Sequence, residues 1–335
     1  MKRIVSLILC VVCSTVMFGQ SAEIVEIQLL SLPENKIDFG KDDKNAAIVA
    51  IHYYANEKNR KSEIFTLDSI LINTVANGIK ETFEESPIFE YADVPVYNIY
   101  SDTSMIGEDM PKAELDMISE QTEAKIVIAV EFINISANYI FEKAKQRPLV
   151  TNVDFVVKIN AYDVETGNKV NKYTGKDNIM IPASYEEDGT YIPAPRIEDA
   201  RRITAEMIGR DFAKRIVPTW ETAERLVFYD SYYDNRNSKL GKAYNLAIKE
   251  NDWASAIQYW TDAIEASTTK SRQAQIMYNI ALSCEMLEKF DLAIKWLEKA
   301  KSLNTRINEN IDEYANILRQ RITDKEKLDE FFTNN

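Results

Sequence analysis

The chain has 335 residues, which is long enough for two domains that each bury a core of their own. Hydrophobic residues make up 45% of it and charged residues 28%, so the composition is that of a folded protein. The formal net charge of −13, without a large basic face, argues against nucleic-acid binding, because that affinity rests on neutralising phosphates.

The first residues have the pattern of an export signal that is removed from the mature protein. Two basic residues open an apolar run, residues 4–18, and Gly19 supplies a small residue at a cleavage point. The run is too short for a comfortable transmembrane helix, which needs about 20 apolar residues. Cys10 and Cys13 lie within it, but neither follows the small residue that bacterial lipidation requires. A cleaved signal over residues 1–19 is therefore favoured over a lipid anchor.

Residues 20–218 have the mixture of strands and helices that is typical of an α/β layer domain. A continuous apolar run at residues 46–51 predicts a strand covered on both faces, and residues 124–133 predict the most buried strand. Apolar residues at helical spacing between Leu67 and Phe83 predict an amphipathic helix. The other expected elements are strands at residues 23–32, 89–91 and 96–100, a helix starting at Pro111, a hairpin of residues 153–162 and 169–181, and a helix at residues 196–216 with Ile203 and Met207 turned inward.

Three segments of this domain give it a resemblance to a group of periplasmic domains. They are residues 48–51 before an amphipathic helix, residues 124–128 after another helix, and residues 163–168 in a hairpin turn. In order and character they resemble the fold shared by the curli-secretion lipoprotein, the TolB amino-terminal domain and the outer-membrane activator of peptidoglycan synthases. The resemblance covers residues 44–217 and implies a place in the cell envelope. The chain lacks the family's lipidated cysteine and a long amphipathic hairpin suited to a membrane pore, which argues against a secretion channel.

Residues 239–335 contain two helix-turn-helix units with a shared pattern of small and large residues. The pattern is alanine, a large apolar residue and alanine, at Ala256, Trp260 and Ala263 and again, 37 residues later, at Ala293, Leu297 and Ala300. It resembles the second helix of tetratricopeptide repeats, whose standard length is about 34 residues. Small residues let paired helices approach closely, and the large residue fills the space one turn on. Neither unit has the family's closing proline, and residues 308–332 are expected to form a capping helix.

The resemblance to tetratricopeptide repeats implies a groove lined by the first helix of each unit. The residues expected to face it are Gly241, Asn245 and Ile248 in the first unit and Gln275, Tyr278, Leu282 and Glu285 in the second. Their mixed polar and apolar character suits an extended peptide or a segment of a partner protein. The identity of that partner and the oligomeric state do not follow from the sequence.

An aromatic connector is expected between the two parts, at residues 219–238. It carries Trp220, Phe228, Tyr229, Tyr232 and Tyr233. A contact seam between the domains is the favoured interpretation, and an exposed platform for a sugar or peptide is the alternative. The helix before the connector is rich in arginine and lysine, which indicates a solvated face or, alternatively, a patch for an anionic partner.

Residues that could carry catalysis are few. His52 is the only histidine, and Cys284 is the only cysteine outside the export signal, so nucleophilic triads and transition-metal sites are disfavoured. Both residues are expected to be structural. Acidic runs at residues 42–43, 84–85 and 186–188 could supply the paired carboxylates of a glycosidase, but adjacency does not place two carboxylates across a substrate. The acidic and amide residues at 230–237 lack the glycine and terminal glutamate of a calcium loop.

The favoured interpretation is an α+β protein, exported and soluble or envelope-associated, of a Gram-negative bacterium. An α/β layer domain with a mixed sheet would be followed by an all-α tetratricopeptide-like module that binds a protein or peptide partner. No catalytic residue, cofactor or metal is expected, and no transmembrane segment is expected after signal cleavage. The alternatives are a carbohydrate-active envelope enzyme that uses paired carboxylates and a lipid-anchored assembly factor.

Overall fold

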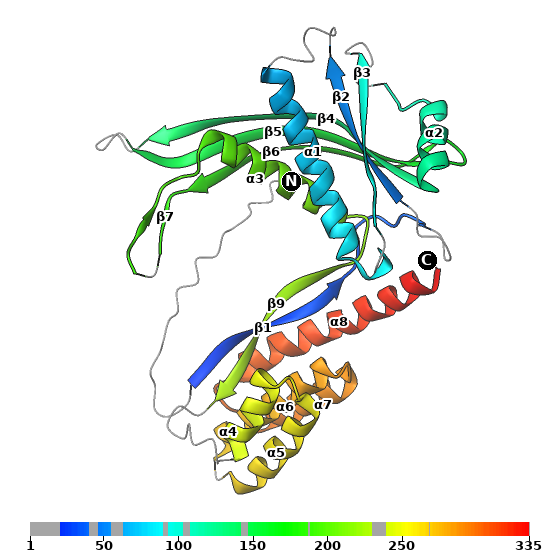
Figure 1. Cartoon of the computed structure of the whole chain (residues 1–335). Coiled ribbons are helices and arrows are strands. Elements are labelled where there is room, and N and C mark those ends of the chain that lie inside the picture. Colours follow the sequence, from blue (N-terminus) through cyan, green and yellow to red (C-terminus); the bar gives the residue numbers. More distant parts are fainter. Residues whose placement is uncertain are drawn as a thin grey trace. The chain divides into compact units, whose positions relative to one another are not determined.

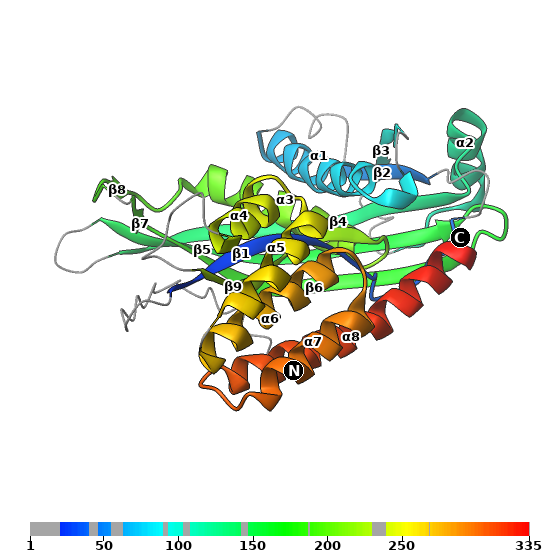
Figure 2. The same cartoon turned by 90° about the horizontal axis from the view of Figure 1, so that it is seen from below.

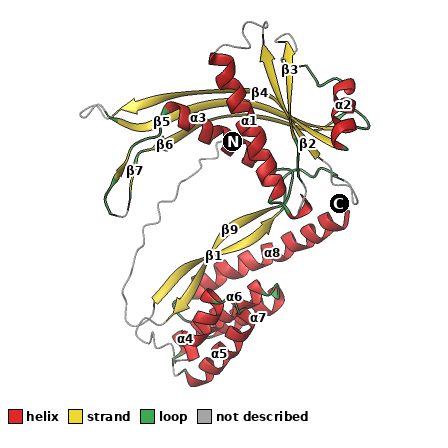
Figure 3. Ribbon diagram, in the orientation of Figure 1, coloured by secondary structure: helices red, strands yellow, loops and turns green. Residues whose placement is uncertain are grey.

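A computed structural model describes residues 21–39, 46–54, 63–89, 93–102, 108–141, 147–186, 188–229, 239–267 and 269–334. The chain divides into two compact units, which we call the sheet unit (residues 30–221 and 328–335) and the helical unit (residues 1–29 and 222–327). The predicted α+β class is confirmed, because a mixed sheet with helices is followed along the chain by an all-helical region (Figures 1 and 3). The expected export signal at residues 1–19 lies outside the described residues.

The centre of the sheet unit is a five-stranded sheet with the order β3-β2-β4-β5-β6. Its buried strands β2 and β4 consist largely of alanine, valine and isoleucine, which pack well on both faces of a pleated sheet. Strand β2 runs parallel to β3 and β4, while β4, β5 and β6 form an antiparallel meander. The strands are β2 (Ala46–Tyr54), β3 (Val96–Asp102), β4 (Ile126–Phe141), β5 (Pro148–Asp163) and β6 (Lys169–Pro182).

Two helices, α1 (Glu63–Glu84) and α3 (Ile197–Lys214), cover one face of this sheet (Figure 2). The two helices cross at two glycines, and the space between the helices at these positions is too small for a side chain. A Cβ atom on Gly209 would lie 2.2 Å from the Val75 carbonyl oxygen, and one on Gly78 would lie 2.7 Å from the Glu206 carbonyl oxygen. Glycine at the crossing therefore permits the close approach of the two helix backbones.

The opposite face of the sheet is covered at one end by α2 (Lys112–Thr122). Leu115 and Ile118 of this helix are buried with Tyr162 of β5 and with alternate residues of β2 and β4. Pro111 lies one residue before the helix, whereas the sequence predicted it in the first turn. The second face is thus partly apolar where β2 and β4 begin.

Several elements of the sheet unit differ from the sequence prediction. Strand β4 continues eight residues beyond the expected end, to Phe141, and its register shifts between Val130 and Phe132. Of the expected strand at residues 89–91, Phe89 is the last residue of the short 3-10 helix η2 (Pro87–Phe89), and the other two residues lie outside the described part of the chain. Ile203 and Met207, predicted to turn inward, are 42% and 41% exposed. The apolar stripe of α3 is therefore wider than the face that this helix buries. A short hairpin of β7 (Ser184–Tyr185) and β8 (Tyr191–Ile192) follows β6.

The helical unit consists of consecutive antiparallel helices. The predicted small-large-small pattern is buried as expected: Ala256 and Ala293 are 0% exposed, and Trp260 and Leu297 are 1% exposed. The capping helix is also present, with Ile311, Tyr314 and Leu318 buried. The elements are α4 (Lys239–Tyr244), which continues into a π-helix, η5 (Asn245–Lys249), and then α5 (Trp253–Ala266), α6 (Lys270–Met286), α7 (Phe290–Ser302) and α8 (Asn308–Asn334).

A two-stranded sheet of β1 (Ser21–Ser31) and β9 (Thr219–Tyr229) completes this unit, to which the two strands belong except for residues 30–31 and 219–221. Gln28 donates a hydrogen bond to the Thr222 hydroxyl at 3.0 Å, although the two residues are 194 positions apart. Residues 219–229, expected to be connector, are therefore strand, and the remainder of the connector lies outside the described residues. No helix within the described part of the chain is long and apolar enough to span a membrane.

Candidate functional site

The residues expected to line a groove lie in the helical unit on α4, η5 and α6, but they are not equally accessible. Gly241, Asn245 and Ile248, in the first helix-turn-helix repeat, and Gln275, in the second repeat, are half-buried. The other three, Tyr278, Leu282 and Glu285, are 5%, 0% and 1% exposed. The second half of the expected groove is therefore filled, and these three residues do not present a free surface.

Strand β9 contributes much of what covers them. The ring of Phe228 packs edge to face against the ring of Tyr278, with centroids 5.2 Å apart. Next to this contact, the side-chain amide of Asn279 forms two hydrogen bonds with the backbone of Phe228. The Phe228 N–H donates to Asn279 Oδ1 at 3.0 Å, and Asn279 Nδ2 donates to the Phe228 carbonyl oxygen at 2.7 Å. Because the amide satisfies both backbone groups, it takes the place of a neighbouring strand.

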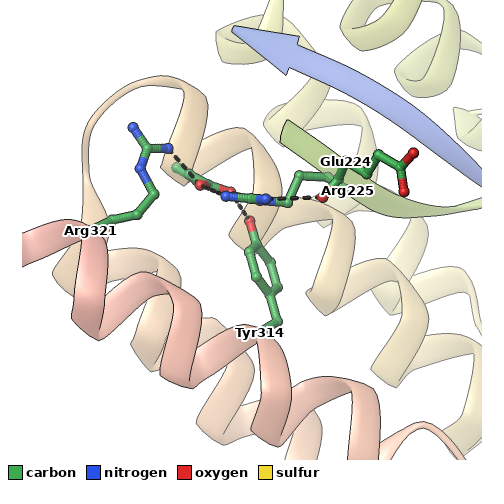
Figure 4. A network of polar contacts seen from close by, with 5 residues as sticks. Glu224, Arg225, Tyr314 and Arg321 are labelled. Carbon is green, nitrogen blue, oxygen red and sulfur yellow. Dashed lines mark hydrogen bonds and ion pairs between the residues drawn. The ribbon is translucent and has the colours of Figure 1, made fainter. Parts of the chain in front are cut away.

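A buried carboxylate, Glu285, joins β9 to α6 and α8 (Figure 4). Arg225 of β9 binds it with two hydrogen bonds, of 3.0 Å from Nε and 2.8 Å from Nη2. Tyr314 Oη and Arg321 Nη1, both from α8, each donate to it at 2.5 Å. The Arg225 side chain also donates to the carbonyl oxygen of Glu224 at 2.9 Å. The fork of an arginine matches the two oxygens of a carboxylate, so the pair fixes the position of β9 on the helices.

The charges of this network explain its protonation state. Burial by itself would raise the pKa of Glu285, but the hydrogen bonds and charge of Arg225, with the bonds from Tyr314 and Arg321, hold it below its usual value. Burial, followed by the charge of Glu285, raises the pKa of Tyr314 well above its ordinary range. Glu285 is therefore ionised and Tyr314 protonated at neutral pH. Such a network can hold segments together, but a carboxylate bound by two guanidinium groups is poorly suited to accept a proton.

The first helix-turn-helix repeat contacts the β1–β9 pair through Tyr244. The hydroxyl of Tyr244 in α4 donates a hydrogen bond to Glu23 of β1, and the Tyr244 ring packs against that of Tyr229 in β9 at 5.9 Å. Asn245 and Ile248 follow on the π-helix η5, where an i to i+5 bond joins the Glu250 N–H to the Asn245 carbonyl oxygen at 3.1 Å. A π-helix is rare and is frequently found at functional sites.

The other candidate residues from the sequence, His52 and Cys284, are buried. His52 is 2% exposed, lies 2.6 Å from Asn98 Oδ1 through its Nε2, and stacks on the Tyr100 ring. Cys284 is 0% exposed, and burial raises the pKa of its thiol to about 11. Among the described residues no three acidic, histidine or cysteine side chains group as metal ligands. The acidic pair at residues 42–43 and the stretch 230–237 lie outside the described residues.

Sequence reasoning missed a second buried carboxylate, Glu131 in the sheet unit. It lies at the register shift of β4 and is 2% exposed. Lys158 Nζ lies 2.7 Å from its Oε2, and the hydroxyl of Tyr162 donates to its Oε1. Burial, together with the bond to Glu131, raises the pKa of Tyr162. A glutamate within an otherwise apolar strand was the available signal, because such a residue needs a partner when it is buried.

Two family models match the chain. Residues 38–228, more than half of the chain, match a domain of unknown function, DUF8603, and residues 245–320 match another domain of unknown function, DUF6340. No curated protein matches the chain.

Two solved structures illustrate the similarity of part of this chain to known proteins. The PelC dodecamer from Paraburkholderia phytofirmans is 15% identical, covers 58% of this chain and 99% of its own, and has a TM-score of 0.26. A homolog of the neuraminyllactose-binding hemagglutinin from Helicobacter pylori is 10% identical, covers 54% of this chain and 84% of its own, and has a TM-score of 0.27. Both TM-scores lie below 0.5.

Proposed function

We propose that this chain, which belongs to the family of the domain of unknown function DUF8603, is a non-enzymatic interaction protein of the bacterial cell envelope. Its helical unit holds extended polypeptide, and it binds a protein or peptide partner at the half-buried residues of α4, η5 and α6 that the chain's own strand leaves accessible. Export rests on the amino-terminal signal pattern. A tetratricopeptide-like arrangement rests on the two small-large-small units.

The observation that carries this proposal is the way the helices hold β9. An extended segment lies against α6, bonded through its backbone to Asn279 and anchored by an aromatic ring and an arginine. Backbone hydrogen bonds with side-chain pockets are the usual means by which proteins recognise extended peptides. The surface thus has the chemistry of a peptide-binding module, and β9 is its resident ligand.

The accessible part of this surface lies beside the resident strand. Gln275, Asn245 and Ile248 are half-buried, so each retains surface that a second segment could contact. Asn245 and Ile248 lie on the π-helix η5, and π-helices are frequently found at functional sites. We therefore place the partner at these three residues and not at Tyr278, Leu282 or Glu285.

Site-specific photo-crosslinking in the native host tests the proposal. A photoreactive amino acid replaces Gln275 or Ile248, and the matched control replaces Glu206, an exposed residue of α3 in the sheet unit. We expect the same discrete protein adduct from positions 275 and 248 and not from position 206. Adducts that are absent at both helical positions, or equally strong at the control, would refute the proposal. Release of reducing ends from envelope glycan by the purified protein would instead support the enzyme alternative.

A further inference from the structure

We propose that the sheet unit carries a second binding site, a polar hollow on strands β4, β5 and β6 that takes a neutral glycan. The hollow has a volume of about 420 Å³. It lies on the face of the sheet opposite the one that α1 and α3 cover. The side chains that line it on this face are those of Asn134, Ser136, Asp154, Val156, Lys176 and Asn178.

The register of the three strands brings the polar side chains of this hollow together. Ser136 pairs with Asp154, and Asp154 pairs with Asn178, so these three form one row across the sheet. Asn134, Val156 and Lys176 form the next row in the same way. Neighbouring strands are about 4.8 Å apart, so the groups of one row are close enough to contact a single ligand.

The sheet positions these groups firmly, although they are exposed. Between them along β4 and β5 lie Ile135 and Phe155, which are 3% and 9% exposed and belong to the core beneath α1 and α3. Successive residues of a strand point to opposite faces, so burial of one set holds the other set outward. The Asn178 Nδ2 atom donates to the Asp154 carboxylate at 2.8 Å, which further orders the row. A site of ordered side chains loses little conformational entropy when it binds.

The chemistry of the lining favours a sugar over other ligand classes. Two amides, a hydroxyl, one carboxylate and one ammonium group offer both donors and acceptors, as the hydroxyl groups of a glycan require. The charges nearly cancel, so neither a phosphate nor a strongly cationic ligand is favoured. Asp154 is already bonded to Asn178, which leaves too few free carboxylates for a metal ion. A peptide would need a deep apolar pocket for an anchoring side chain, whereas the half-buried Val156 offers only a shallow apolar floor.

The polar rows continue beyond the hollow, which suggests a chain of sugars instead of one. Asn138 and Asn152 pair in the row after Ser136, where Asn152 Nδ2 donates to Asn138 Oδ1 at 3.2 Å. From Asn134 to Asn138 the strand rises about 13 Å at roughly 3.3 Å per residue. Met180 ends that row and is 61% exposed, so it offers an apolar contact for the face of a sugar ring.

A glycan array probed with the purified mature chain tests this site. The array carries neutral and acidic oligosaccharides, and hits are measured by calorimetry with the same oligosaccharides in solution. We expect binding to one neutral class. The variants Asn134→Ala and Asn178→Ala should each weaken it about fivefold or more, which corresponds to the loss of a typical hydrogen bond. The control Thr174→Ala changes an exposed residue of β6 outside the hollow and should leave the affinity unchanged.

Each outcome decides the matter. A neutral glycan whose affinity falls in both hollow variants and not in the control supports the site. Failure of every glycan to bind, binding unaffected by the hollow variants, or selective binding of acidic glycans overturns it. The changed side chains are exposed, so thermal unfolding of the variants should match that of the parent and exclude misfolding. The site does not depend on the proposed role of the helical unit, because the crosslinking positions lie on other residues.

Discussion

Replacement of Glu285 by leucine should destabilise the helical unit by about 3–5 kcal/mol, the range found when one partner of a buried ion pair is removed. Leucine has a similar size and leaves no polar group behind. Arg225, which is 7% exposed, would lose the carboxylate that binds it twice. The fully buried hydroxyl of Tyr314 would lose its acceptor, which typically costs about 1–3 kcal/mol. Arg321 is partly exposed and can turn to water, so its loss adds little.

The companion variant decides whether the charge or the packing matters. Arg225→Met with Glu285→Leu removes both charges and replaces them by apolar side chains. Such replacements are often neutral or stabilising, so the double variant should regain a large part of the loss. We expect a coupling energy of at least about 2 kcal/mol between the two positions, within the range known for residues in direct contact.

Tryptophan fluorescence during urea unfolding gives the required local readout. Trp253, Trp260 and Trp296 belong to the helical unit, whereas Trp220 belongs to the sheet unit and is 54% exposed. All variants are therefore made in a Trp220→Phe background, so that the fluorescence reports on the helical unit alone. A local probe matters because a protein of two units need not unfold in one transition.

The exposed pair of Lys301 and Asp312 supplies the control. Both side chains are about half exposed, so Lys301→Met should change stability by less than about 1 kcal/mol. Our reasoning is refuted if Glu285→Leu costs no more than this control, or if the double variant is as unstable as the sum of its single variants.

The stability of the helical unit should also fall at acidic pH. Because the pKa of Glu285 is lowered in the folded state, its contribution is present above about pH 4.5, the ordinary glutamate value, and is lost as the pH falls through the lower folded value.

Three further variants or reagents test separate features. Gly209→Ala should lower the melting temperature of the sheet unit, with a loss of about 1–3 kcal/mol, because the new Cβ atom would overlap the Val75 carbonyl oxygen. Asn279→Leu should cost about 1–3 kcal/mol, measured by urea unfolding, and should speed hydrogen exchange at the Phe228 amide, which loses its acceptor. Native Cys284 should resist iodoacetamide at pH 8, since burial raises the pKa of its thiol to about 11, and should react at once in denaturant.

Each of these has a matched comparison. Glu206→Ala on α3 is exposed and should leave the melting temperature unchanged. For Asn279, the comparison is Gln320→Leu, which removes an exposed side-chain bond to Asp324. The thiol experiment uses a chain without Cys10 and Cys13, so that mass spectrometry reports on Cys284 alone. Tolerance of Gly209→Ala, an unchanged exchange rate at Phe228, or rapid native alkylation would each contradict the corresponding argument.

The periodicity of the sequence predicts the packing of the helical unit but not the segment that occupies the expected groove. Ala256, Trp260, Ala293 and Leu297 repeat at fixed spacing, and such a local pattern is enough to place their side chains in a core. Glu285 also lies on the helix face that meets an extended segment. The segment is strand β9 of the same chain. Its place depends on contacts between residues far apart in the sequence, and a local pattern does not predict such contacts.

The composition of β9 explains why the sequence predicts a connector and not a strand at residues 219–229. Its apolar run is short, from Leu226 to Tyr229, and it follows the charged residues Glu224 and Arg225, of which Arg225 is buried. The carboxylate of Glu285 neutralises the charge of Arg225 and so stabilises the arginine in the interior. The apolar stripe of α3 is likewise wider than the face that this helix buries, so the spacing of its apolar residues alone does not show that Ile203 and Met207 are exposed.

The pairing of β1 with β9 has a consequence for how the molecule assembles. A nascent chain emerges with its amino end first, so strand β1 appears long before the strand that it pairs with. Gln28 must wait for Thr222, 194 positions later, and closing so long a loop slows assembly. Until then β1 has two unpaired edges, which are prone to aggregation. A product that ends before β9 would keep this orphan strand, and we expect holding chaperones and proteases to act on it first.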